Sequence, residues 1–239
     1  MSIDYSIIIP AYNEEDYLAN TITALKEAMP HISLEGEIIV VDNNSSDDTA
    51  KIAKQNRVKV IFEAINQISR ARNAGARAAK GRYLIFVDAD TIIPTALLQQ
   101  ALSNLESGKI IGGGACIAGD MPLHFSMQIL LELWNWISVT TYNAAGSFIY
   151  CHDDAFKEVD GFSEAVYASE EIWLSRSLRK LGKKRNQAFE IIKQPPVITS
   201  IRKMQWYSPL RIYLYVLLLA VFPFTVRIKS LCTLWYRRP

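Results

Sequence analysis

Short runs of β-branched residues alternate with longer segments of helical spacing over residues 1–110, and this alternation limits the fold more than any other feature. The expected strands cover residues 5–10, 37–41, 58–62 and 82–87. The expected helices cover residues 14–29, capped by Asn13, and then 47–55 and 69–80. Strands that alternate with helices predict an α/β protein, with a mostly parallel sheet and helices on both faces.

The second half of the sequence is less regular. Gly112–Gly114 interrupts an apolar stretch, and turns are expected at Asp160–Phe162 and at Pro195-Pro196. Two helices are expected over 122–142 and 170–181, the second ended by Gly182, with a strand over 146–151. The sequence shows no repeat and no low-complexity linker, which predicts one domain over residues 1–203 and a separate segment, 204–239.

The charges are unevenly distributed along the chain. Residues 1–190 contain all 24 acidic residues and carry a net charge of −6, whereas residues 191–239 contain eight basic residues and no acid. Residues 212–226 are uncharged, but this stretch is shorter than the roughly 20 apolar residues of a membrane-spanning helix. Apolar segments rich in aromatic and basic residues bind at membrane interfaces. Residues 204–239 are therefore expected to form a helical tail that contacts a membrane or packs on the core.

The cysteines and the first residues bear on the compartment. The three scattered cysteines are too few for a disulfide framework or a zinc knuckle, which favours a reducing compartment. The first residues lack the basic region of a secretory signal, and their first apolar run, Ile7–Ile9, is short. Residues 1–203 are therefore expected in the cytoplasm, at the inner face of the cell membrane.

Three polar clusters follow the expected strands: Tyr12–Glu14, Asp42–Asn44 and Asp88–Asp90. Ligands of such sheets bind at the carboxyl ends of the strands. Side chains two positions apart on an extended chain point the same way, so the carboxylates of Asp88 and Asp90 can converge on Mg2+ or Mn2+. The alternative is that Asp90 only caps the following helix.

The other polar residues at this edge each have two interpretations. Asp42 could accept a hydrogen bond from a nucleobase or ribose, or could form an Asx turn. Glu14 could bind a ligand or lie in a first helical turn, where acids are favoured. Arg72, with Arg70 and Asn73, could offset the charge of a diphosphate or lie on a solvated helix face. The sequence contains neither a P-loop nor a dinucleotide fingerprint, which weakens both of those classes.

Three weaker candidates lie in the second half. Arg202-Lys203 could contact a diphosphate or an anionic acceptor, or lie on a plain basic surface. His152 could bind a metal or line an acceptor pocket, or be incidental beside a capping Asp. Trp134 and Trp136 could stack on a sugar, although their helical spacing among apolar neighbours is more typical of core.

Several of these segments, taken in order, resemble the family 2 glycosyltransferases. The opening SIIIPAYNEE of Ser6–Glu15 is similar to the start of that family, and further blocks follow in the family's order. These blocks are residues 37–49, 72–75, 81–90, 160–162 and 169–178, so the resemblance covers most of residues 5–182. Each block is modest alone, and their order makes the resemblance specific.

The resemblance implies a GT-A fold, a nucleotide-sugar donor, a metal that bridges the donor diphosphate to the acidic motif, and transfer with inversion. On matching positions, the residues that would bind the nucleotide are Pro10, Ala11, Tyr12, Glu14 and Asp42. Asp88 would face the ribose or the sugar, and Asp90 would bind the metal. Arg72 would lie near the diphosphate.

The Glu170-Glu171 pair matches the acidic block that supplies the catalytic base in this family. An inverting transfer needs one base beside the acceptor hydroxyl, and adjacent helical residues point in different directions, so only one of the two can serve. The family commonly has Glu-Asp here with Asp as the base. That alignment favours Glu171 over Glu170, although the longer side chain leaves both assignments open.

The sequence thus predicts a metal-dependent inverting glycosyltransferase that uses a UDP-sugar rather than a GDP-sugar. The expected acceptor is a hydroxyl group of a lipid-linked or cell-envelope glycan. Alternatives are a polyprenyl-phosphate sugar transferase, a catalytically silent nucleotide-sugar binding module, and a nucleotidyltransferase, whose Gly-rich phosphate loop the sequence lacks. Nucleic-acid binding has little support, because the basic residues of the tail are spread among apolar ones.

Overall fold

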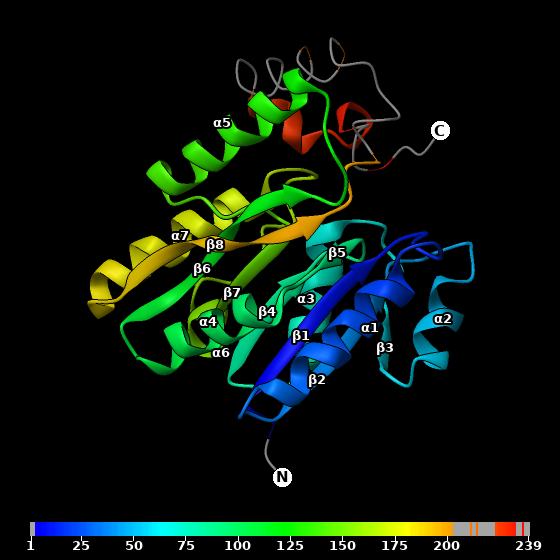
Figure 1. The fold of residues 1–239 in the computed structure, drawn as a ribbon, viewed down its shortest axis with the longest axis horizontal. Coiled ribbons are helices and arrows are strands. Elements are labelled where there is room, and N and C mark those ends of the chain that lie inside the picture. The colour runs from blue at the N-terminus through cyan, green and yellow to red at the C-terminus, as the bar shows by residue number, and fades with distance from the viewer. Residues whose placement is uncertain (1–2, 203–210, 212–213, 215–222, 233–235, 237–239) are drawn as a thin grey trace.

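The computed structural model describes residues 3–202, 211, 214, 223–232 and 236 (Figure 1). Its sheet has the strand order β3-β2-β1-β4-β7-β6-β8-β5. The strands are β1 (Tyr5–Ala11), β2 (Gly36–Asp42), β3 (Lys59–Phe62), β4 (Tyr83–Val87), β5 (Thr91–Ile92), β6 (Ile110–Gly119), β7 (Phe148–His152) and β8 (Ala188–Thr199). The α-helices are α1 (Leu18–Ala28), α2 (Thr49–Gln55), α3 (Ile68–Ala78), α4 (Thr95–Glu106), α5 (Phe125–Thr141), α6 (Asp153–Glu158) and α7 (Glu170–Arg185).

The first half of the sheet is parallel, as the alternation of strands and helices predicts. β1 pairs in parallel with β2 and β4, and β2 pairs in parallel with β3. The second half is mixed, because β7 runs antiparallel to both β4 and β6, while β6 and β8 are parallel. The carboxyl ends of β1, β2 and β4 therefore meet at one edge, towards the upper right in Figure 1.

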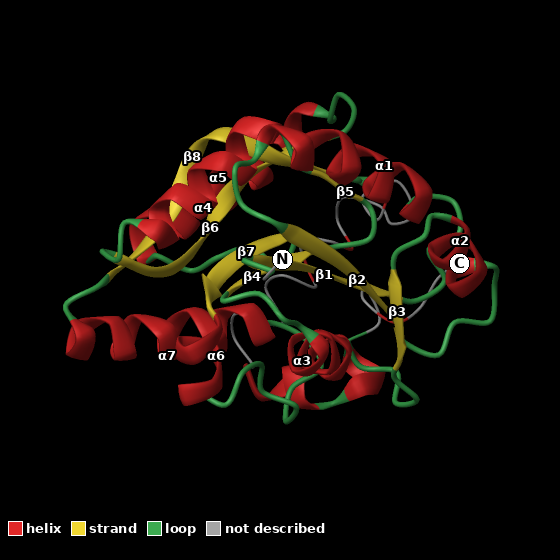
Figure 2. Cartoon of the chain, turned by 90° about the horizontal axis from the view of Figure 1, so that it is seen from below, coloured by secondary structure: helices red, strands yellow, loops and turns green. Residues whose placement is uncertain are grey.

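Helices cover both faces of the sheet, with α1 and α4 on one side and α3, α6 and α7 on the other (Figure 2). Alternate residues of β1 point to opposite faces. Ile7 and Ile9 pack in a core with α1 and α4, whereas Ile8 packs in a second core with α3 and α7. The helix α5 lies apart from these layers, at the upper end of the view in Figure 1, and contacts β6 and β8.

The first helix begins later than the sequence predicts. Asn13 has a φ of 53° and does not cap α1; its side-chain oxygen accepts from the backbone N of Ser46 at 2.8 Å. A turn follows, in which the carbonyl of Glu14 accepts from the N of Leu18, and α1 begins at Leu18. The prediction of a helix over 14–29 was therefore wrong at its start, because a contact from a distant loop holds Asn13.

Glycines and prolines of the second half lie inside regular elements, contrary to expectation. Gly112–Gly114 lies within β6, where a Cβ on Gly113 would come 1.9 Å from the carbonyl oxygen of Glu190. Pro195 and Pro196 lie within β8 beside an irregularity in its pairing with β6. Gly182 lies inside α7, which continues to Arg185 and ends at Asn186 in the left-handed conformation. Close packing of neighbouring backbone explains these glycines better than turns do.

The described part of the C-terminal segment contacts the domain. It contains two 3-10 helices, η2 (Pro223–Arg227) and η3 (Lys229–Leu231). Val226 and Cys232 are buried with Val166 and Ala168, and the carbonyl of Val226 accepts from the N of Tyr167. Among the described residues, no helix is long and apolar enough to cross a membrane. The expectation of a helical tail over 204–239 falls mostly outside the described residues.

Candidate active site

The loops that follow β1 and β2 are joined by hydrogen bonds. Glu14 N donates to Thr49 Oγ1 at 2.7 Å, and Asn13 N donates to Ser45 Oγ at 3.1 Å. In the sheet, Pro10 lies opposite Val41 and Ala11 lies opposite Asp42. The nucleotide-binding candidates Pro10, Ala11, Tyr12, Glu14 and Asp42 therefore lie at one edge of the sheet.

Asp42 is buried at the end of β2, and one of its oxygens forms the turn that the sequence offers as an alternative. Its Oδ1 accepts from Ser45 N at 3.0 Å. The next residue, Asn43, was predicted only as a member of the polar cluster Asp42–Asn44, and the structure shows that it joins the end of β2 to the start of α3 by hydrogen bonds. Its Nδ2 donates to the carbonyl of Ile65 at 2.7 Å, and its Oδ1 accepts from Gln67 N at 2.9 Å.

Arg202, which follows β8, joins two of the acidic candidates. Its Nη2 lies 2.7 Å from each carboxylate oxygen of Glu14 and 2.9 Å from Oδ2 of Asp90. The guanidinium is buried, and its Cζ lies 4.2 Å from the ring centroid of Tyr17. The sequence indicated Arg202 only as a weak candidate for the site, because the residues that it contacts are far away along the chain.

Arg72 holds a second group of acids. Its Nη1 donates to Glu170 Oε1 at 2.6 Å, and its Nη2 donates to Asp88 Oδ1 and to the carbonyl of Gly146, both at 2.8 Å. Arg72 is only 1% exposed, so it lies beneath the site rather than on a solvated helix face. Two neighbours of Arg72 on α3 have other partners. Arg70 pairs with Glu164 at 3.0 Å, and Asn73 forms hydrogen bonds with the backbone of Phe162.

The two candidate bases stand at the start of α7 in different surroundings. Glu170 is buried against Arg72, and burial raises its pKa while the charge of Arg72 acts in the opposite direction. Glu171 is half-buried. Burial, followed by the nearby charge of Glu170, raises the pKa of Glu171 to about 8. A carboxyl group with such a pKa is a better proton acceptor near neutral pH than an ordinary one.

The acidic motif after β4 is divided between the two arginines. Asp88 pairs with Arg72, and Asp90 pairs with Arg202. Asp90 does not cap the next helix, because α4 begins at Thr95 after Pro94. No group of three His, Cys, Asp or Glu among the described residues could hold a metal by itself. Mg2+ and Mn2+ sites are often completed by substrate phosphates, so carboxylates that already attract a cation fit such a metal.

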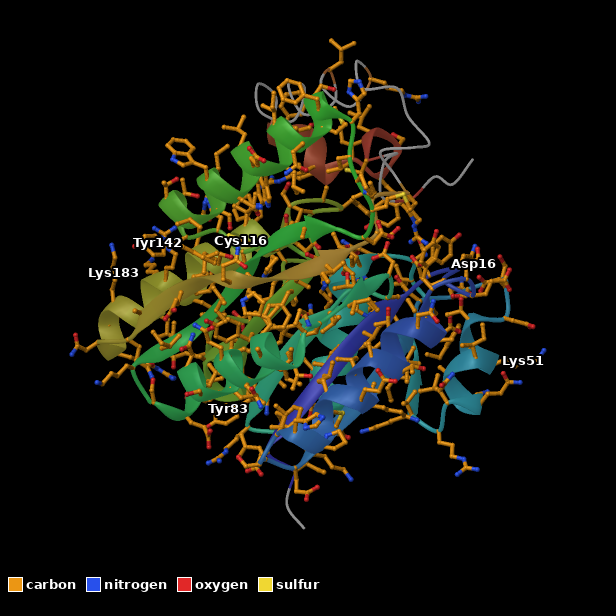
Figure 3. All side chains as sticks on the ribbon, viewed as in Figure 1. Asp16, Lys51, Tyr83, Cys116, Tyr142 and Lys183 are labelled. Carbon is orange, nitrogen blue, oxygen red and sulfur yellow. The ribbon has the colours of Figure 1, made fainter. Side chains whose placement is uncertain are left out.

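His152 lies away from this edge. β7 pairs antiparallel with β4, and His152 lies opposite Tyr83, which is labelled in Figure 3 at the far end of β4 from Asp88. One ring nitrogen of His152 lies 3.1 Å from the carbonyl of Ile110, and its ring packs edge-on against Tyr83. His152 therefore packs within the fold, and the structure does not bring it close to Asp88 and Asp90.

Comparison with known sequences places the chain in a family. The model of the family described as glycosyl transferase family 2 matches residues 6–158, so the chain belongs to this family. The uncharacterized glycosyltransferase EpsJ of Bacillus subtilis is 34% identical over 117 residues, which cover 46% of this chain and 33% of EpsJ. The dolichol-phosphate mannosyltransferase of Saccharomyces cerevisiae is 32% identical over 136 residues, 52% of this chain and 51% of the yeast protein. The match thus spans about half or less of these relatives.

Comparison with solved structures supports the GT-A fold. The mannosyltransferase PcManGT of Pyrobaculum calidifontis, in complex with GDP-Man and Mn2+, aligns with a TM-score of 0.68 and 16% identity. That alignment covers 99% of this chain and 71% of PcManGT. The fragment 1–349 of S. aureus TarS, in complex with UDP-GlcNAc, aligns with a TM-score of 0.64 and 20% identity, covering 95% of this chain and 69% of that fragment. The predicted α/β fold, GT-A in kind, is confirmed.

Proposed function

We propose that the protein transfers a sugar from a nucleotide-sugar donor, UDP-linked rather than GDP-linked, to an acceptor hydroxyl group with inversion. The observation that carries this proposal is the single edge of the sheet at which two arginines hold the acids of three separate segments. This edge would supply a donor-binding side, around Glu14, Asp42 and Asp90, and a candidate base, Glu171. Membership of the glycosyltransferase family supports the same reaction class.

Each residue has a role in this reaction. Pro10, Ala11, Tyr12 and Asp42 would line the nucleobase and ribose pocket, and Asp88 would face the ribose or sugar. Glu171 would accept the proton of the acceptor hydroxyl, since its raised pKa suits a base near neutral pH. Glu170 is then a positioning residue, because its carboxylate is taken up by Arg72.

Mg2+ or Mn2+ is the proposed cofactor, and Asp90, with Asp88, would hold it. A bound divalent metal would stabilise the negative charge of the departing nucleoside diphosphate. Arg202 is the cation already present beside Asp90, and it would share in neutralising that charge. Support for a metal comes from the anionic donor set and from the Mn2+ of the PcManGT complex.

The proposed acceptor belongs to a lipid-linked or cell-envelope glycan. One relative, TarS, is named a poly(ribitol-phosphate) β-N-acetylglucosaminyltransferase. The match to a dolichol-phosphate mannosyltransferase favours a second candidate function, transfer to a polyprenyl phosphate. A phosphate acceptor is already ionised, so replacing Glu171 should then have a much milder effect than in transfer to a hydroxyl.

A thermal-shift titration with UDP- and GDP-sugars, each with and without Mn2+, tests the donor. A donor at 100 times its dissociation constant should stabilise the fold by about 2.7 kcal/mol. Asp90→Asn should remove the metal-dependent part of the shift, whereas the exposed Asp48→Asn should leave it intact. Mass spectrometry that detects transfer of the sugar to water or to an acceptor distinguishes an active enzyme from a catalytically silent binding module. No shift with any donor would contradict the proposal.

A further inference from the structure

The loop before α7, residues 159–169, leads directly into the helical turn that carries the candidate base. Glu171 is the second residue of α7. Ser169, the last residue of the loop, has a φ of 61° and does not cap the helix with its side chain. The place of the first turn therefore depends on the contacts that hold the end of the loop, as well as on the pair of Arg72 and Glu170.

The start of α3 provides the first of these contacts. The side-chain Nε2 of Gln67 donates to the carbonyls of Glu164 and Val166, at 2.9 and 2.8 Å. Gln67 is buried, and its backbone N donates to Oδ1 of Asn43. The loop is thus fixed to the same helix that carries Arg72.

The C-terminal segment holds the loop at the next residues along the chain. The backbone N of Tyr167 donates to the carbonyl of Val226 at 2.6 Å. Val226 and Cys232 are 6% and 0% exposed. They share a small buried cluster with Val166 and Ala168 of the loop. The end of the loop is therefore held both by α3 and by the C-terminal segment.

Tyr236 joins the C-terminal segment to the loop and to α3 at once. Its ring packs edge-on against the ring of Tyr167, with the centroids 6.0 Å apart. Its hydroxyl accepts from the backbone N of Ile68 at 3.4 Å. Beside it, Lys229 Nζ donates to the carbonyl of Asn66 at 2.8 Å and lies 5.1 Å from the centroid of the Tyr236 ring.

Tyr236 also lies near the buried ion pair at the start of α7. Burial raises the pKa of its hydroxyl, and the negative charge of Glu170 raises it further, while the positive charge of Arg72 acts in the opposite direction. Only nearby charges shift a pKa in this way. The C-terminal segment therefore reaches the surroundings of the candidate base.

We propose that the C-terminal segment, with Tyr236 as its main positioning residue, holds the first turn of α7 so that Glu171 can reach the acceptor. This inference rests on the proposed function, in which Glu171 is the base. The contacts described above are with residues 66–68 and 166–168 rather than with the acids that would bind the donor and metal. Loss of these contacts should therefore lower kcat and leave donor binding intact. A displacement of about 1 Å at a reacting group can cost about 100-fold in rate.

Steady-state kinetics of two Tyr236 variants tests this role. Tyr236→Ala removes the ring and the hydroxyl and should lower kcat about tenfold to 100-fold, with the donor KM changed by less than about threefold. Tyr236→Phe keeps the ring against Tyr167 and should retain most of the wild-type kcat. The matched control is Ile228→Ala, which changes a 42% exposed side chain of the same segment and should behave like the wild type.

Hydrogen–deuterium exchange tests the positioning without any turnover. Tyr236→Ala should speed exchange in peptides covering residues 166–174 by about tenfold or more, because the bond from Tyr167 to Val226 would open more often. Peptides from β1 and β4 should exchange as in the wild type, and the donor-dependent thermal shift should be unchanged. Tyr236→Leu, which keeps apolar volume, replaces Tyr236→Ala if thermal unfolding shows that the alanine variant does not fold.

Two outcomes would overturn the proposal. Equal exchange of residues 166–174 in the variant and the wild type would show that the segment does not hold α7. Faster exchange with a wild-type kcat would show that the base does not depend on the segment. Absence of sugar transfer by the wild type would instead contradict the proposed function, and the exchange result would still decide whether Tyr236 holds the first turn of α7.

Discussion

Arg72 Nη1 lies 2.6 Å from Glu170 Oε1, and both side chains are buried. This contact joins α3 to the first residue of α7. The other end of the guanidinium contacts Asp88, after β4, and the carbonyl of Gly146, before β7. One side chain therefore sets the relative positions of the acidic motif and of the helix that carries the candidate base.

Arg72→Met should destabilise the fold strongly, because it leaves the buried carboxylate of Glu170 without its partner. Removing one member of a buried ion pair typically costs about 3–5 kcal/mol in the free energy of unfolding. Urea denaturation measures this loss. The control is Arg70→Met on the same helix, whose pair with Glu164 is partly exposed and should contribute only about 0–1 kcal/mol.

The double variant Arg72→Met/Glu170→Gln checks the cause. Removing both charges should cost less than the sum of the two single changes, because neither charge is then left uncompensated. Additive losses would show that Arg72 stabilises the fold through packing, including its position 5.1 Å from the ring of Phe162, rather than through Glu170.

Arg202→Ala should strengthen the binding of Mn2+ to the donor-free protein by about threefold to tenfold. The guanidinium lies 2.9 Å from Asp90 Oδ2, so it competes with a metal for that carboxylate and also lowers the negative potential of the site. Electron paramagnetic resonance of free Mn2+ measures the affinity without any turnover. Arg227→Ala, at an exposed position, is the control. Unchanged or weaker binding would place the metal away from Asp90.

Gly113→Ala should destabilise the sheet, because its Cβ would lie 1.9 Å from the carbonyl oxygen of Glu190 on the neighbouring strand. Backbone cannot yield as a flexible side chain does, so a loss of about 1–3 kcal/mol or more is expected in urea denaturation. Gly119→Ala is the comparison, since its nearest neighbour is a side-chain methyl of Ile201 at 2.9 Å. Equal losses would mean that the strands can separate locally.

The parallel core was predictable from local pattern. β1, β2 and β4 are buried or mostly buried runs with Pro or Asp at or just after their ends, and their approximate boundaries and parallel direction follow from the strand–helix alternation. The sequence also indicated which edge would gather Glu14, Asp42 and Asp90. These predictions succeeded because each rests on residues close together in the chain.

The remaining features depend on contacts between distant residues. Asn13 was predicted to cap a helix, but its side-chain oxygen instead accepts a hydrogen bond from the backbone N of Ser46. The glycines of β6 looked like a break, because nothing local shows that a neighbouring strand will approach them closely. Arg202 could not be assigned to Glu14 and Asp90 without the fold, since it follows β8 and lies more than 100 residues away from both along the chain. Which acid of the Glu170-Glu171 pair contacts Arg72 was likewise undecided until α3 and α7 were placed together.

Glu171 should impose opposite pH dependences on stability and on activity. Its pKa is raised from 4.5 to about 8 in the folded protein, first by burial and then by the charge of Glu170. Between these pH values the folded state keeps a proton that the unfolded chain has lost, so this group makes the fold less stable as the pH rises from about 4.5 to about 8. A base must be deprotonated, so kcat/KM should increase over the upper part of the same range.

Glu171→Gln should remove both dependences. The variant should lose about 100-fold to 10,000-fold in kcat, the usual contribution of a general base, while its donor-induced thermal shift is retained. Its melting temperature should exceed that of the wild type at pH 8 by more than at pH 5, because over this range the unfolded wild-type chain is stabilised by losing a proton that the folded carboxyl still holds. Glu158→Gln, at an exposed position on α6, should change neither profile. If Glu170→Gln instead removes the pH dependence of kcat/KM and Glu171→Gln does not, the base is Glu170.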